Sequence, residues 1–408
     1  MPLVSKEASA PAPAGGTATL VAPAAVRTGR PEPTPVRSRG ELPTSWEVSE
    51  FAVPTGREES WRFTPVGRLA ALFADEPATA ELGWSAVVPD GVTISDVSRA
   101  QVRDLDVPAP ADRAAVVAAA QAGTARRIDI PASLELTDPI RVDLVGESAS
   151  GQARGHVLIT AGPMSSATVV LAHTGASSYG QVVSILAGPG AQLTVVTVAD
   201  WEDGAVHLAE HDVVIGRDAT VRHIAVTLGG SIVRVATNAT YAGPGGSFEG
   251  IGLYFADAGQ HQEHRLFVDH EAPHCRSDVV YRGALQGEGA HAVWIGDVLI
   301  RAAAEGTHTY EINRNLLLSD GARADSVPNL EIETGEILGA GHASTTGRFD
   351  DEQLFYLQSR GLTEADARRL VVHAFFAELV GRIGVADLAE SIMAAIDAEL
   401  AGTMAGGA

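Results

Sequence analysis

The sequence predicts a mainly β protein in which a parallel β-helix, or β-solenoid, is flanked by helical regions at both ends. Residues 126–348 consist largely of short runs rich in Val, Ile and Thr, and glycine ends many of these runs, which indicates strands and turns. Turn-like tetrapeptides recur within this region at nearly equal spacing. Apolar residues at helical spacing appear before and after it.

The repeat is the most informative of these observations. Tetrapeptides at residues 188–191, 216–219, 243–246 and 272–275 each precede a predicted strand, and their starts lie 28, 27 and 29 residues apart. A repeat of this length is typical of solenoids, because one coil cannot bury its own apolar face and needs stacked neighbours. A β-sandwich is an alternative that local alternation does not exclude.

The N-terminal part divides into two regions. Residues 1–36 are rich in Ala and Pro with few large apolar groups, so we expect them to be disordered. Residues 37–125 are expected to be mainly helical, with a helix over residues 111–121. The expected core anchors of this region are its large apolar side chains: Trp61, Phe63, Val66, Leu69 and Leu72.

Residues 349–408 are expected to form a C-terminal helical domain. A helical pattern begins at Asp351, and Gly361 is placed to end that helix. Thr363 and Asp366 resemble a capping box at the start of the next helix. The apolar stripes of these helices fit either packing on the β core or docking of a partner, since both need an apolar face.

Charge and hydropathy limit the class of protein. The chain carries 29 basic and 51 acidic residues, a formal charge of −22, so nucleic acid and anionic membranes are poor partners. It has no apolar run of about 18 residues, the length that a membrane span needs. No compact apolar segment follows Lys6, so the sequence does not support a signal peptide. We therefore expect a cytoplasmic protein.

Cysteine and histidine patterns define the candidate metal sites. Cys275 is the only cysteine, and a cluster bound by thiolates usually needs several. Histidines crowd residues 261–308, which leaves open a stand-alone metal-dependent enzyme beside structural or surface roles for these residues. His274 adjoins Cys275 and could lower the pKa of its thiol, although a lone cysteine can also be a buried small side chain.

His342 is the main candidate site residue. It follows the small residues 339–341, which leave its imidazole accessible to a partner or a metal. A surface histidine in a turn is the simpler interpretation. No nucleophile elbow and no dinucleotide fingerprint accompany it.

Several motifs resemble the SufB/SufD family of iron–sulfur cluster assembly proteins. They are ESWRFT at 59–64, NRNLLLS at 313–319, VPNLEI at 327–332 and the long run GHASTTGRFDDEQLFYLQSRG at 341–361. The resemblance covers roughly residues 38–383. It implies a right-handed parallel β-helix and a non-enzymatic scaffold subunit.

The resemblance also indicates the SufD-type branch and its site. A SufB-type chain carries a cysteine where this sequence has Asn313, and a glutamate where it has Ala343. The histidine of the SufD-type motif is present here as His342. The resemblance therefore implies that His342 is a cluster ligand, or part of the route to the cluster, at an interface with SufB. Some SufD proteins have a cysteine two residues before this histidine; here Ala340 stands there, so a thiolate would come from SufB.

The partners implied by the resemblance are SufB, in a heterodimer, and the ABC-type ATPase SufC. The residues expected to dock SufC belong to the C-terminal helices: Leu354, Phe355, Leu370, Phe375 and Phe376. A transient iron–sulfur cluster is the expected cargo. A reduced flavin, FAD, can accompany such a complex, and no residue here indicates its site. A plain homodimer is a further alternative.

Overall fold

The structure, a computed structural model, describes residues 43–406. The predicted disorder of residues 1–36 lies outside the described residues. Strands make up 48% and helices 19% of the structure, and the strands form a parallel β-solenoid of about 8 turns. The predicted solenoid is therefore confirmed, and the β-sandwich alternative is wrong.

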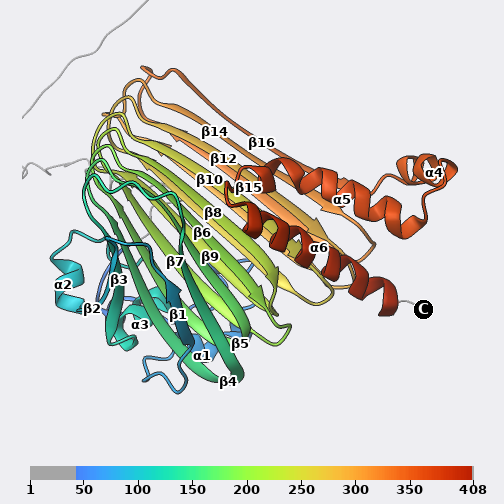
Figure 1. Ribbon diagram of the computed structural model, residues 1–408, viewed down its shortest axis with the longest axis horizontal. Helices are drawn as coiled ribbons and strands as arrows, with labels where there is room; N and C mark the ends of the chain where they lie inside the picture. The colour runs from blue at the N-terminus through green and yellow to red at the C-terminus, as the bar shows by residue number, and fades with distance from the viewer. Residues whose placement is uncertain (1–42, 407–408) are drawn as a thin grey trace, which may run out of the picture. The chain divides into compact units, whose positions relative to one another are not determined.

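Each coil of the solenoid contains two main strands, and these belong to two parallel sheets (Figure 1). One sheet has the order β15-β13-β11-β9-β7-β5 and the other β5-β6-β8-β10-β12-β14-β16. The strands are β5 (Ser166–Ala187), β6 (Gln192–Trp201), β7 (Val206–Ile215), β8 (Thr220–Gly229), β9 (Ile232–Tyr241), β10 (Ser247–Ala256), β11 (His261–His270), β12 (Arg276–Leu285), β13 (His291–Ile300), β14 (His308–Leu317), β15 (Arg323–Ile332) and β16 (Gly339–Arg348).

The two sheets join at β5. Its first part, from Ser166 to Gly175, pairs with β6, and its second part, from Ser178 to Ala187, pairs with β7. The preceding strand β4 (Ile140–Ala161) is equally long and pairs with β5 along both parts, with a register shift between them. β4 and β5 are therefore two long strands that bend from one sheet into the other.

The predicted repeat corresponds to a stack of turns along one edge of the solenoid. The third residue of each tetrapeptide has a left-handed backbone, with φ of 68° at Gly190, 54° at Asp218, 76° at Gly245 and 61° at His274. Each of these residues donates its backbone N–H to a carbonyl of the next coil, over 2.7 to 3.2 Å. The spacing in the sequence is thus the length of one coil.

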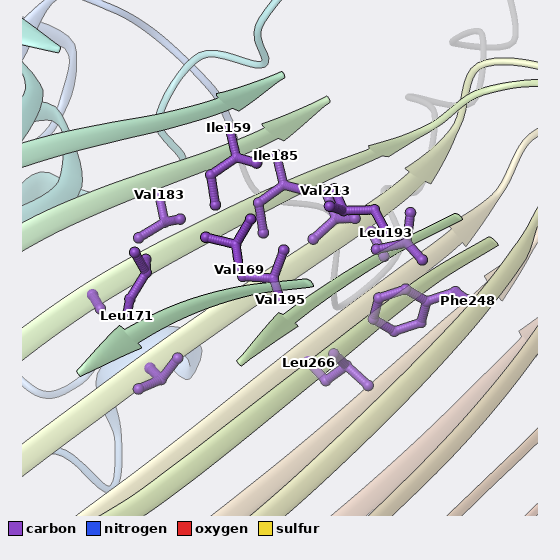
Figure 2. Packing of buried hydrophobic residues seen from close by; sticks show 14 of the residues in the cluster. Ile159, Val169, Leu171, Val183, Ile185, Leu193, Val195, Val213, Phe248 and Leu266 are labelled. Carbon is purple, nitrogen blue, oxygen red and sulfur yellow. The ribbon is translucent and has the colours of Figure 1, made fainter. Parts of the chain in front are cut away.

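The interior of the solenoid is a column of apolar side chains that alternate along every strand. Figure 2 shows Val169, Leu171, Val183, Ile185 and Val195 pointing toward one another between the sheets. Their intervening neighbours, such as Val170 and Val196, belong to a different cluster on the outer face. This period of two places one set of side chains inside every coil.

The N-terminal region covers the outer face of the sheet that contains β7 and β9. Trp61, Leu69 and Leu72 are buried against Leu208 and Ile232, which confirms three of the expected anchors. Helices here are α1 (Ala70–Phe73), α2 (Arg99–Arg103) and α3 (Arg113–Gln121), with 3-10 turns at Val48–Glu50, Glu59–Trp61 and Val66–Arg68. Strands β1 (Gly83–Val87) and β2 (Thr93–Ser98) were not predicted; β1 pairs with β4, and β2 with β3 (Thr124–Ile130).

The C-terminal helices are α4 (Asp351–Ser359), α5 (Glu364–Gly381) and α6 (Ala386–Gly406). Two of them, α5 and α6, cover the opposite sheet, whereas α4 contacts α5 (Figure 1). Gly361, with φ of 94°, follows α4 as predicted, and Thr363 caps α5 by accepting the Asp366 N–H over 3.1 Å. None of the described helices is long and apolar enough to cross a membrane.

Candidate functional site

The last coil is the least covered part of the solenoid. β15 and β16 stand at the two ends of the strand order, so each has one edge without a paired strand. Their residues are exposed or half-buried, whereas nearly every residue of β13, one coil earlier, is buried. Free strand edges are the part of a sheet to which another strand can be added.

His342 lies on β16 and faces the interior side of this last coil. The register pairs it with Glu311 of β14, so the two side chains occupy the same position in successive coils. Its side chain is 42% exposed because no further coil covers it. The expectation of a turn histidine is wrong, since pairing with β14 holds residues 339–348 in a strand despite their small side chains.

Glu311 is a site residue that the sequence analysis missed. Its side chain is 1% exposed, and its Oε1 lies 3.8 Å from Nδ1 of His342. Neither carboxylate oxygen accepts a hydrogen bond of normal geometry within residues 43–406. Burial, with a smaller effect of Asp297, raises the pKa of Glu311 to about 8, and the Asn329 backbone amide acts in the opposite direction. Its alternation with Asn313 and Asn315 was the available sequence signal.

Asn313 on β14 is fully buried. Its Nδ2 donates to the Tyr254 hydroxyl over 2.9 Å, and its Oδ1 accepts from Asn315 over 2.7 Å. Asn315 also donates to the Thr346 hydroxyl on β16, over 3.4 Å. A polar network therefore runs through the interior to the open coil.

Cys275 and His274 do not join this site. They belong to the turn before β12, and the register puts β12 two coils away from β16. Burial raises the pKa of the Cys275 thiol, so the expectation that His274 lowers it is wrong. Cys275 points inward as a small buried side chain, and His274 supplies a left-handed turn residue.

The histidines of residues 261–308 are distributed over different faces. His264 and His270 point inward, where they contact Thr227 and Ser277 over 3.0 and 2.9 Å, and burial lowers the pKa of each to about 3. His261 contacts His291, with 3.1 Å between the two Nδ1 atoms. Within residues 43–406, no three His, Cys, Asp or Glu side chains converge on a metal position.

The predicted docking residues differ in accessibility. Phe355 on α4 is 73% exposed and Leu370 on α5 is 51% exposed. Leu354 and Phe375 are half-buried. Phe376 is fully buried against the outer face of the solenoid, so it packs the helix on the sheet and is unavailable for docking.

Comparison with known proteins connects this architecture to a family. Residues 144–375, more than half of the chain, match the description "SUF system FeS cluster assembly, SufBD core domain". The chain belongs to the SufBD family. The matched segment contains most of the solenoid, the His342 end and much of α5.

Relatives in this SufBD family agree over most of the sequence. The chain is 48% identical over 371 residues to a SufBD family protein of Mycobacterium tuberculosis, covering 89% of this chain and 93% of the relative. A SufBD family protein of Mycobacterium leprae is 47% identical over 370 residues, with 89% and 94% coverage. The SufD protein of Escherichia coli is 30% identical over 196 residues, 48% of this chain and 46% of that protein.

Proposed function

We propose that this protein is a SufD-type scaffold subunit, which pairs with a SufB-type partner at the open end of its solenoid and binds a SufC-type ATPase through its C-terminal helices. The observation that carries the proposal is the position of His342. It is an accessible imidazole on the last coil, on β16, which is one of the two strands with a free edge. A partner seated there would reach both that edge and the ring.

The composition of the site supports a shared assembly site. Imidazole nitrogen and thiolate sulfur are ligands that iron accepts in clusters. His342 provides the nitrogen, whereas Cys275 lies buried in a turn of another coil. The remaining ligands of a nascent cluster would therefore come from the partner. The cluster is cargo that is built and passed on, with no reaction catalysed by this chain alone.

The SufD-type assignment is favoured by Asn313. An asparagine bonded to Tyr254 and Asn315 has no nucleophilic sulfur to offer, and its burial makes it part of the interior packing. Similarity to the E. coli SufD protein is in accord with this. SufB would then carry the thiol chemistry.

The C-terminal helices offer a surface for the ATPase. Phe355, Tyr356 and Leu370 are large apolar side chains that remain exposed on α4 and α5, while the other face of α5 is buried on the sheet. Exposed apolar groups of this kind favour a protein contact. Because α5 rests directly on β10 and β12, a force applied by the ATPase would reach the solenoid.

Co-purification tests the proposal. We would co-express the chain with the SufB-type and SufC-type proteins of the same organism and measure the mass and composition of what elutes. We expect one assembly that contains all three proteins. A chain that elutes alone or as a homodimer in the presence of both partners would contradict the proposal.

A further inference from the structure

In the part of the chain that the structure describes, a buried carboxyl group that no side chain hydrogen-bonds lies next to the accessible histidine, and the Asn329 backbone amide is the one backbone group that acts on it. Glu311 and His342 are register partners on β14 and β16, and both project to the interior side of the solenoid. Within residues 43–406, His342 provides the basic side-chain atom that approaches Glu311, with Nδ1 at 3.8 Å from Oε1. Burying a carboxyl group that accepts no hydrogen bond from a side chain costs free energy, so the presence of Glu311 needs an explanation.

The surrounding residues hold Glu311 in this position. A Cβ atom at Gly296 of β13 would lie 2.3 Å from Oε2 of Glu311 and 2.4 Å from Cη2 of Trp294. Only glycine therefore leaves room for both side chains across the solenoid. The Glu311 carboxyl group therefore lies against β13 and faces His342.

The geometry distinguishes the two nitrogens of His342. Nδ1 is the ring nitrogen that faces Glu311, at 3.8 Å from Oε1. Nε2 occupies the other edge of the ring, and the side chain is exposed at the end of the solenoid. Histidines that bind metals almost always donate their second N–H to a carboxylate, a carbonyl or water, which fixes the tautomer and the ring direction.

We infer that Glu311 is a positioning residue, whose carboxyl group accepts the Nδ1–H of His342 and so presents Nε2 as the ligand atom to iron at the open end of the solenoid. The inference rests on the proposed function, since that function supplies the iron. The 3.8 Å separation is longer than a hydrogen bond, and such contacts often tighten only when the ligand is bound.

The tautomer of His342 tests this inference on the isolated full-length chain. Nitrogen-15 NMR of histidine-labelled protein identifies which ring nitrogen carries the proton, and His342→Gln assigns the signal. We expect Nδ1–H in the wild-type protein and loss of that preference in Glu311→Met, which keeps the side-chain length and removes the acceptor. Ser326→Ala removes another unpartnered polar atom of the last coils and serves as the control, with an unchanged His342 signal.

Iron binding by the three-protein complex gives the second readout. We expect Glu311→Met to weaken anaerobic Fe(II) binding about 10- to 100-fold, the usual effect of removing such a second partner. The double variant with His342→Ala should bind no more weakly than His342→Ala alone, because both changes act through one nitrogen. If Glu311→Met destabilises the chain, Glu311→Asp, which withdraws the carboxylate by one methylene, is compared in the same way and should lose part of the Nδ1–H preference.

The outcomes separate this inference from the proposed function. An unchanged tautomer and wild-type Fe(II) affinity in Glu311→Met, together with loss of Fe(II) in His342→Ala, would overturn the role of Glu311 and leave the function intact. Wild-type Fe(II) affinity in His342→Ala would overturn the function itself.

Discussion

Arg234 on β9 and Asp112 at the start of α3 form a buried ion pair, with 2.8 Å between Nη1 and Oδ2. The guanidinium also lies over the Trp61 ring, 3.9 Å from its centroid. Asp112 accepts the Ala115 N–H over 2.9 Å and thereby caps α3. The Arg234 guanidinium therefore holds both α3 and the segment around Trp61 on the outer face of the solenoid.

Removal of Asp112 is expected to weaken this attachment strongly. Asp112→Ala leaves the Arg234 guanidinium without its closest partner in a buried position, which typically costs about 3–5 kcal/mol. Urea unfolding measures the loss. Asp96→Ala, which removes an exposed partner of Arg126, is the control and should change stability by about 0–1 kcal/mol. Equal effects of the two substitutions would contradict this account.

Acidification is expected to destabilise the fold below about pH 6.5. Burial lowers the pKa of His156, His173 and His223 to about 4, and of His264 and His270 to about 3. Between these values and 6.5 the unfolded chain binds protons that the folded chain does not, so stability falls as pH falls. Each histidine contributes up to about 1.4 kcal/mol per pH unit.

Raised pKa values of buried carboxyl groups, such as Asp212 at about 7, act in the opposite direction and offset part of this loss. The denaturation midpoint at pH 7.5 and at pH 5.5 gives the net slope. His264→Gln should reduce that slope by the share of one histidine. A pH slope that His264→Gln leaves unchanged would be evidence against a neutral buried His264.

Overpacking at Gly283 is expected to disturb the polar network of the interior. A Cβ atom there would lie 1.8 Å from Cε2 of Tyr254, whose hydroxyl accepts from Asn313. Gly283→Ala should therefore cost about 1–3 kcal/mol. Gly204→Ala, with no atom within 4 Å of the added carbon, is the control. Comparable melting temperatures for both variants would show that Tyr254 moves aside without a loss of stability.

We predict that the exposed side chains of Phe355 and Leu370 are needed to bind the SufC-type ATPase. The double variant Phe355→Ser, Leu370→Ser should lose co-purification with the SufC-type ATPase while its melting temperature stays unchanged, because both side chains are already exposed. Val87→Ser changes an equally exposed residue on β1 and should retain the ATPase. Retention of the ATPase by the double variant would remove these helices from the interface.

The solenoid could be predicted because its repeat is local. Each tetrapeptide needs a left-handed backbone at its third position, which is glycine in two repeats, Asp218 in another and His274 in the last. The bent strands β4 and β5 were harder to predict, because the polar and glycine-rich stretches at 146–155 and 173–181 resemble turns between separate strands. Strands β1 and β2 were missed because their stability comes from pairing with distant segments.

The site could be predicted only in part. His342 stands in a recognisable motif, but its strand conformation depends on pairing with β14, thirty-one residues away in the register. Glu311 has no motif of its own; only its inward position identifies it. Both Phe355 and Phe376 lie in apolar helical stretches, so the sequence does not show which of them is buried. The contact of α5 with the sheet buries Phe376, whereas Phe355 on α4 is exposed.

The most direct test of the central claim is the iron and sulfide content of the anaerobically reconstituted three-protein complex, with and without His342→Ala. We predict that the variant assembles with both partners but loses most of its cluster. His308→Ala, another histidine exposed on the last coils, should keep it. A His342→Ala complex with the wild-type content of iron and sulfide would contradict the claim that this residue helps to hold the nascent cluster.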